Sequence, residues 1–266
     1  MTDATDAALL DAAHAGDTDA AAALVTRHAA RVMRFARSLC DNAVDADDAA
    51  QEALIAAYHG VGSVRSAAAL PSWLYTVTRS FCTKQRRRLR AGDIPLEDGP
   101  PVASHERGPE GDAAGREVAG ALTQALRGLD PKYREVVWLR DVEGFTAPEV
   151  AETLDVEIAA VKTRLHRGRA QIRARMEPVF AMNKAGPACP DIVERFSSYL
   201  EGDIGTLECD SLKEHVESCA SCNAACEALK RTVGMCNTQT SSVPADVQDR
   251  VKQALLIAIG KNLHPA

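Results

Sequence analysis

Three side chains near the end of the chain have the types and the spacing of metal ligands. His215, Cys219 and Cys222 form the pattern His-x3-Cys-x2-Cys. In a continuous helix, at about 100° per residue, Cys219 and Cys222 lie on one face with His215, each within about 40° of it. One imidazole and two thiols are ligands that soft and borderline divalent metals prefer. The spacing therefore predicts a metal site.

Further thiols surround this pattern. Six of the eight cysteines lie between Cys189 and Cys236. Cys226 follows His215 by eleven residues, which is about 16 Å of helix, so these two side chains cannot bind the same ion. Cys226 could form a second, thiolate-rich site with Cys209 and Cys236, or replace a ligand of the first site. Such spare thiols favour a metal sensor over a purely structural zinc site.

The start of the chain does not have the pattern expected of an export signal. It reads Met-Thr-Asp-Ala-Thr-Asp, and no run of 18 or more apolar residues occurs anywhere. A secretory signal begins with basic residues followed by an apolar stretch, and a membrane-spanning helix needs about 20 apolar residues. We therefore expect a cytoplasmic protein without a membrane partner. Thiols stay reduced in that compartment, so clustered cysteines indicate metal ligands before disulfides.

Charge is unevenly distributed along a chain whose formal net charge is −6. Residues 84–90 contain five basic side chains and residues 161–175 contain six, with no acidic side chain in either stretch. Residues 189–236 contain nine acidic and four basic side chains. Focused basic stretches indicate contact with nucleic-acid phosphates, whereas the net charge argues against a simple nucleic-acid coat protein.

Helical periodicity runs through most of the chain and predicts an all-α protein. Prolines and glycines interrupt it after the first basic stretch, which is typical of a linker. A second break precedes the cysteine-rich segment. The expected parts are a helical domain at 5–91, a linker at 92–115, a second helical domain at 116–177, a cysteine-rich domain at 186–240 and a C-terminal helix at 244–260.

A helix-turn-helix pattern occupies residues 134–169. Gly144 ends one helix, Thr146 caps the next, and Asp155 occupies a turn that requires a left-handed backbone. In the following helix we expect an apolar face of Ile158, Val161 and Leu165 toward the core, and Lys162, Thr163, His166 and Arg167 toward a major groove.

Residues 10–175 resemble the extracytoplasmic-function sigma factors of bacterial RNA polymerase, the small members of the sigma-70 family. Two stretches carry the resemblance. The residues Asp45-x2-Asp48-x2-Gln51-Glu52, followed by Trp73-Leu74-x4-Arg79, are similar to region 2 of the family, and residues 134–169 are similar to its region 4.2.

The resemblance implies two helical sigma domains that bind the RNA polymerase core enzyme and promoter DNA. Region 2 would dock on the polymerase and read the −10 element, and region 4 would read the −35 element. The implied polymerase-binding residues are Asp45, Asp48, Gln51 and Glu52. The implied DNA-binding residues are Arg79, Arg86 and Arg87 in region 2, and Lys162, Thr163, Arg164, His166 and Arg167 in region 4.

The last third of the chain resembles the zinc-binding anti-sigma fold. The similar residues are Cys189-x2-Ile192, Tyr199-Leu-Glu-Gly202 and the His-x3-Cys-x2-Cys pattern. This resemblance implies that Cys189 is the fourth metal ligand. The fusion of such a domain to a sigma factor resembles the metal-responsive CorE-like group. Its copper-responsive pattern carries a Cys-x-Cys pair, where this chain has only Cys209, so zinc or cadmium is favoured over copper.

These patterns predict a non-enzymatic sigma factor whose activity depends on a metal effector. We expect the metal-loaded protein to direct polymerase to its promoter and the metal-free protein not to do so. Two alternatives are a redox-sensitive zinc module, in which thiol oxidation expels the metal, and a purely structural zinc module. A thiol oxidoreductase is disfavoured because no strand–helix alternation surrounds Cys219 and Cys222.

Overall fold

The computed structural model describes residues 5–40, 42–91, 113–179 and 188–237, together with four isolated positions at 253, 255, 257 and 260. Within these residues all regular structure is helical, which confirms the predicted all-α class. Most of the expected linker and most of the expected C-terminal helix lie outside the described residues. The chain divides into two compact units, residues 1–107 with 241–266 and residues 108–240.

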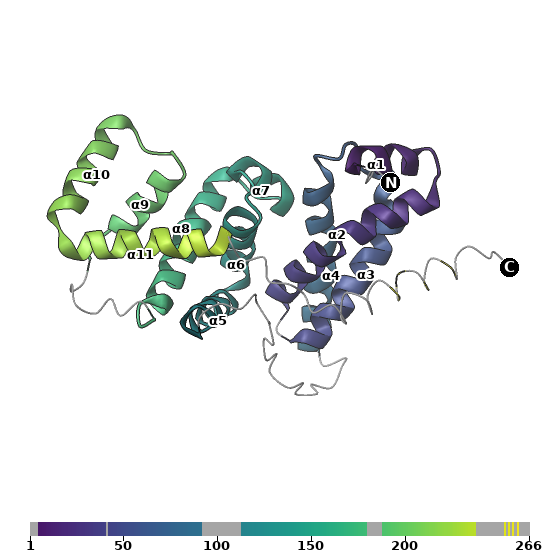
Figure 1. Ribbon diagram of the computed structural model, residues 1–266, viewed down its shortest axis with the longest axis horizontal. Helices are drawn as coiled ribbons and strands as arrows, with labels where there is room; N and C mark the ends of the chain where they lie inside the picture. The colour runs from purple at the N-terminus through teal and green to yellow at the C-terminus, as the bar shows by residue number, and fades with distance from the viewer. Residues whose placement is uncertain are drawn as a thin grey trace. The chain divides into compact units, whose positions relative to one another are not determined.

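The first unit is built on three long helices that pack against one another, with a short helix against the first of them (Figure 1). Its core includes Phe35 and Tyr75, whose ring centroids lie 4.6 Å apart in an edge-to-face arrangement. Asn42 caps the third helix by accepting a hydrogen bond from the backbone N–H of Asp45. The elements are α1 (Asp6–His14), α2 (Thr18–Leu39), α3 (Ala43–Gly60), a 3₁₀ turn (Val61–Ser63) and α4 (Leu70–Ala91).

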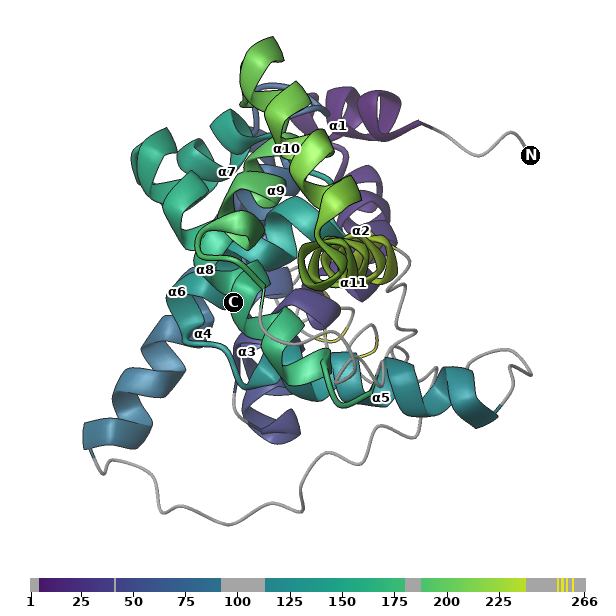
Figure 2. The same ribbon diagram turned by 90° about the vertical axis from the view of Figure 1, so that its left-hand side faces the viewer.

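The second unit contains the predicted helix-turn-helix and the cysteine-rich segment. Helices of both parts are in contact within it: α9 and α11 each pack against α8 (Figures 1 and 2). The elements are α5 (Ala113–Arg127), α6 (Pro131–Val137), a π-helical turn (Trp138–Val142), α7 (Ala147–Leu154), α8 (Ile158–Met176), α9 (Ile192–Leu200), α10 (Thr206–Ser218) and α11 (Ala220–Asn237).

Local signals in the sequence set the helix-turn-helix as predicted. The Thr146 hydroxyl accepts from the backbone N–H of Glu149, and the Glu149 carboxylate accepts from the backbone N–H of Thr146, forming a capping box at the start of α7. Gly144 has a φ of +77° and Asp155 a φ of +53°, the left-handed conformations that end the two helices.

One expectation for the apolar face of α8 is wrong. Val161 and Leu165 are buried, but Ile158 is 42% exposed. Ile158 is the first residue of α8. The first turn of α8 therefore does not pack against the core, and contact with the core begins at Val161.

Candidate metal centre and DNA-reading face

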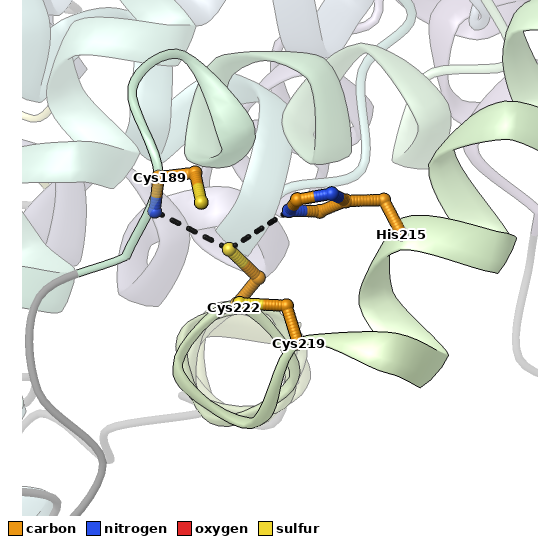
Figure 3. Close-up of side chains that lie close together, drawn as sticks. All are labelled: Cys189, His215, Cys219 and Cys222. Carbon is orange, nitrogen blue, oxygen red and sulfur yellow. Dashed lines mark hydrogen bonds between the residues drawn. The ribbon is translucent and has the colours of Figure 1, made fainter.

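The predicted metal ligands converge. Cys189, His215, Cys219 and Cys222 each place a ligand atom within 4.8 Å of all the others (Figure 3). Cys189 comes from the segment before α9, His215 from the last turn of α10, and Cys222 from the first turn of α11. Two helix ends and one connecting segment thus position the four side chains.

The backbone at Cys219 differs from the single helix that the spacing suggested. α10 ends at Ser218, Cys219 has an extended conformation with φ −113° and ψ 104°, and α11 begins at Ala220. A continuous helix would separate His215 and Cys222 by about 10 Å along its axis, which is too far for one ion. The break at Cys219 folds α11 back on α10 and brings the two side chains together.

Hydrogen bonds converge on the Cys222 sulfur (Figure 3). It accepts from the backbone N–H of Cys189 at 3.3 Å and lies 3.2 Å from Nε2 of His215. Burial raises the pKa of the Cys222 thiol to about 11. The backbone N–H of Cys222 lowers the pKa of Cys219. Cys222 is buried in the domain, whereas Cys219 is half-buried and lies nearer the surface.

The four side chains fit zinc. Three cysteines and one histidine form one of the common tetrahedral sets of structural zinc sites. Zinc–ligand bonds of about 2.0–2.3 Å place neighbouring ligand atoms roughly 3.5–3.8 Å apart. The observed limit of 4.8 Å is reached from this geometry by small side-chain movements. When bound, zinc would crosslink the start of the domain to the α10–α11 corner.

The structure does not form the predicted second site. Among the described residues, Cys209, Cys226 and Cys236 make no metal-binding group. Cys226 and Cys236 both lie on α11, and ten residues of helix separate them by about 15 Å. Burial raises the pKa of Cys226 to about 12 and also raises that of Cys236. Cys226 belongs to the apolar core of the domain, beside Cys222.

The recognition helix α8 has a covered flank, formed by Lys162, His166 and Arg169. Lys162 Nζ lies 2.9 Å from a carboxylate oxygen of Asp203. The Nε2 atom of His166 lies 3.3 Å from the hydroxyl of Ser198. Both partners belong to the cysteine-rich domain, so two of the predicted −35 contacts face protein in this structure.

Arg169 is the buried centre of this flank. Its guanidinium pairs with both carboxylate oxygens of Asp141 and donates to Glu201 at 2.7 Å and to the Ser197 hydroxyl at 3.0 Å. Glu201 also accepts from Arg140 at 2.7 Å. Asp141 belongs to the helix-turn-helix, whereas Ser197 and Glu201 belong to the cysteine-rich domain. Arg169, which the sequence placed only in a basic stretch, thus joins the two parts.

The other predicted −35 contacts form an open flank, consisting of Thr163, Arg164 and Arg167. Thr163 and Arg167 are exposed and Arg164 is half-buried. The three side chains line a pocket of about 430 Å³ together with Lys132 and Tyr133. The structure therefore divides the five predicted residues between a flank that faces protein and a flank that remains accessible.

In the first unit the predicted polymerase-binding residues differ in exposure. Asp48 and Glu52 are exposed and Gln51 is half-buried. Asp45 is 9% exposed and accepts from the side chains of Asn42 and Gln85. Asp45 therefore has a structural contact between α3 and α4. Partial loss of solvent around the carboxylate, followed by repulsion from the neighbouring acidic groups, raises the pKa of Asp48.

The predicted −10 contacts lie on α4. Arg87 is exposed, and Arg79 and Arg86 are half-buried.

Among the described residues, no helix combines the length and apolar character needed to cross a bilayer.

Comparison with known families agrees with this organisation. A sigma-70 region 2 model matches residues 24–92, and a sigma-70 region 4 model matches residues 119–172. A zinc-finger family model matches residues 189–223, a range that contains all four clustered ligands. The match and the cluster together support zinc binding.

Comparison with individual proteins gives the same result. The chain is 37% identical over 169 residues to the ECF RNA polymerase sigma factor SigM of Mycobacterium tuberculosis, covering 63% of this chain and 83% of SigM. It is 31% identical over 185 residues to the RNA polymerase sigma factor CnrH of Cupriavidus metallidurans, covering 65% and 94%. A solved structure of CnrH with the cytosolic domain of CnrY matches with a TM-score of 0.46 and 26% identity, over 65% of this chain and 97% of that chain. On its identity to SigM and to CnrH, the chain belongs to the extracytoplasmic-function sigma factors, non-enzymatic proteins that bind the RNA polymerase core and promoter DNA to initiate transcription, and it carries a C-terminal zinc-finger domain of the anti-sigma type.

Proposed function

We propose that metal binding to Cys189, His215, Cys219 and Cys222 controls transcription initiation by this sigma factor. The observation that carries the proposal is the contact between the metal-binding domain and the recognition helix. The loop that follows α9 holds Lys162 through Asp203 and Arg169 through Glu201. A change in the fold of this domain would therefore alter the surface that reads the −35 element.

The coupling depends on how the domain is held together. Its apolar core is small and centres on Ile192, Leu212, Cys222 and Cys226. Small domains of this kind commonly need their metal to fold, with binding free energies on the order of 10 kcal/mol. Because Cys222 is both a ligand and a core residue, occupancy of the site and packing of the core are linked. The positions of α9 and α11 on α8 follow from that packing.

Zinc and cadmium are the favoured effectors, with copper as the alternative. A set of three thiolates and one imidazole suits zinc, cadmium and copper. Cys209, the remaining thiol of the Cys-x-Cys position, lies on α10 outside the four-ligand group. The absence of a second thiol beside it disfavours the two-coordinate geometry of Cu(I).

A run-off transcription assay tests the proposal. The metal-stripped full chain is combined with core polymerase and a promoter template, with and without Zn(II), Cd(II) or copper. Because the metal-folded domain holds Lys162 and lies against His166 of the recognition helix, we expect less transcript with Zn(II) or Cd(II) than without them, the reverse of the direction expected from the sequence. A Cys222→Ser chain should give the same transcript in every lane. Equal transcript from the unsubstituted chain in all lanes contradicts metal control, and more transcript with metal contradicts repression by the docked domain.

Redox control is a second candidate, supported by the three sulfur atoms of Cys189, Cys219 and Cys222 within 4.8 Å of one another. Oxidation to a disulfide would remove two ligands at once. Titration of the zinc-loaded chain with peroxide separates the two candidates. Zinc release that parallels a change in transcript supports redox control, whereas a transcript that responds to metal and not to peroxide supports metal sensing.

A further inference from the structure

The outward surface of α8 is divided along its length. With about 100° per residue and Lys162 at zero, the covered flank spans roughly −20° to 40° and the open flank roughly 100° to 200°. The buried residues Val161, Leu165 and Ile172 lie at roughly 260° to 300°, toward the core. The direction away from the core, roughly 100°, therefore falls at Thr163, on the edge of the open flank. A major groove that received this helix fully would have to contact both flanks.

The cysteine-rich domain hinders contact between DNA and α8 on the covered flank only. Asp203 and Glu201 supply the carboxylates that hold Lys162, Arg140 and Arg169. Burial lowers the pKa of His166, which favours its neutral form within this contact. On the covered flank, Arg169 is thus buried and Lys162, although 38% exposed, is engaged in an ion pair with Asp203.

The open flank has the composition of a phosphate site. The pocket beside it has no acidic residue in its lining, which consists of Lys132, Tyr133, Ala159, Ala160, Thr163, Arg164 and Arg167. The Thr163 hydroxyl donates to the backbone carbonyl of Ala159 at 2.9 Å, so the three cationic side chains are the groups that can donate to a ligand. Lys132 makes only loose contacts, 3.9 Å to a carboxylate oxygen of Asp130 and 5.0 Å to the ring centroid of Tyr133. Three cations around one hollow suit the oxygens of a DNA backbone.

We infer that the docked form binds duplex DNA by its backbone through Lys132, Arg164 and Arg167, without reading bases. Asp203, by holding Lys162, prevents the change from backbone contact to base reading. The cysteine-rich domain then controls the sequence specificity of region 4 more than its attachment to DNA. This inference needs region 4 to bind DNA but does not need metal control.

The salt dependence of binding tests the inference, because each phosphate contact adds about 0.9 to the slope of log affinity against log salt. The zinc-loaded full chain is titrated against a duplex of random sequence, roughly 30 base pairs long, at several salt concentrations. Lys132→Ala and Arg167→Ala should each make the slope shallower by about one. Lys132 and Arg167 are both exposed, so neither substitution removes a buried side chain. Lys230→Ala, at an exposed position on α11, is the matched control and should leave the slope unchanged.

The covered flank is tested by releasing Lys162. Asp203→Asn should make the slope steeper by about one, and adding Lys162→Ala should abolish that gain. Asp210→Asn, at an exposed acidic position on α10, is the control for loss of a negative charge and should cause no change. Unchanged slopes for Lys132→Ala and Arg167→Ala overturn the backbone site, and an unchanged slope for Asp203→Asn overturns the covered flank. All slopes are measured at a fixed zinc content. Their outcome therefore tests the two flanks of α8 independently of the metal control that the transcription assay tests.

Discussion

Cys222 and Cys226 are two buried thiols one helical turn apart on α11, yet only Cys222 belongs to the ligand group. Cys222→Ser should weaken zinc binding by about 100-fold or more, since a tetrahedral site would lose one of its protein ligands. Cys226→Ala should keep one zinc per chain and lower the stability of the second unit by about 1–2 kcal/mol through lost core packing. A competition titration against a chromogenic chelator measures both affinities. Equal loss of zinc in the two variants would show that the ligand set is wrong.

Sequence reasoning reached the four ligands because their types and spacing are local, apart from Cys189, which the family resemblance supplied. It could not reach the ion pairs of Arg169. A basic residue in a basic stretch gives no sign that it is buried, and its partner Glu201 lies 32 positions away. Asp45 shows the same limit, because its bond to Gln85 spans 40 positions and gives a residue assigned to polymerase binding a structural contact.

At the scale of the elements, helix ends were more predictable than helix breaks. Thr146, Gly144 and Asp155 each have a side chain or backbone preference that specifies a boundary, and each boundary lies where it was expected. The break at Cys219 has no such signal, since Ser218, Cys219 and Ala220 are all compatible with a helix. Packing of α10 against α11 around the ligands decides it, and packing is not visible in a local pattern.

The close approach of α6 and α8 depends on Gly168. A Cβ atom at this position would lie 2.6 Å from Cγ2 of Val137, a distance that requires one of the helices to move. Gly168→Ala should therefore lower the stability of the second unit by about 1–2 kcal/mol, the overpacking cost exceeding the gain in helix propensity. Thermal unfolding followed by circular dichroism measures the change.

Gly120→Ala on α5 is the matched control for Gly168. A Cβ atom at Gly120 would have no neighbour within 4 Å, so alanine there should raise stability by about 0.5–1 kcal/mol. If both alanine variants were stabilised, the close contact between α6 and α8 would not exist in solution.

At the scale of the whole molecule, the helix-turn-helix and the cysteine-rich domain belong to one compact unit, while region 2 belongs to the other. The sequence indicated a separate C-terminal domain because residues 183–190 break the helical pattern. The contacts of α9 and α11 with α8 join that domain to region 4 instead. They depend on Arg140, Lys162 and Arg169 meeting acidic groups from a distant segment, which periodicity and composition cannot specify.

Metal removal should consequently affect one unit and spare the other. A ligand that binds only the folded state stabilises it by about 4 kcal/mol at roughly 1,000 times its Kd, so a strong zinc chelator should lower the unfolding temperature of the second unit alone. Differential scanning calorimetry of the full chain should show two transitions, of which only one moves. Hydrogen exchange assigns it: amides of α8 and α11 should exchange faster after chelation, while those of α3 keep their rates. Faster exchange confined to α9–α11, with α8 unchanged, would show that the metal-binding domain folds without influencing the recognition helix.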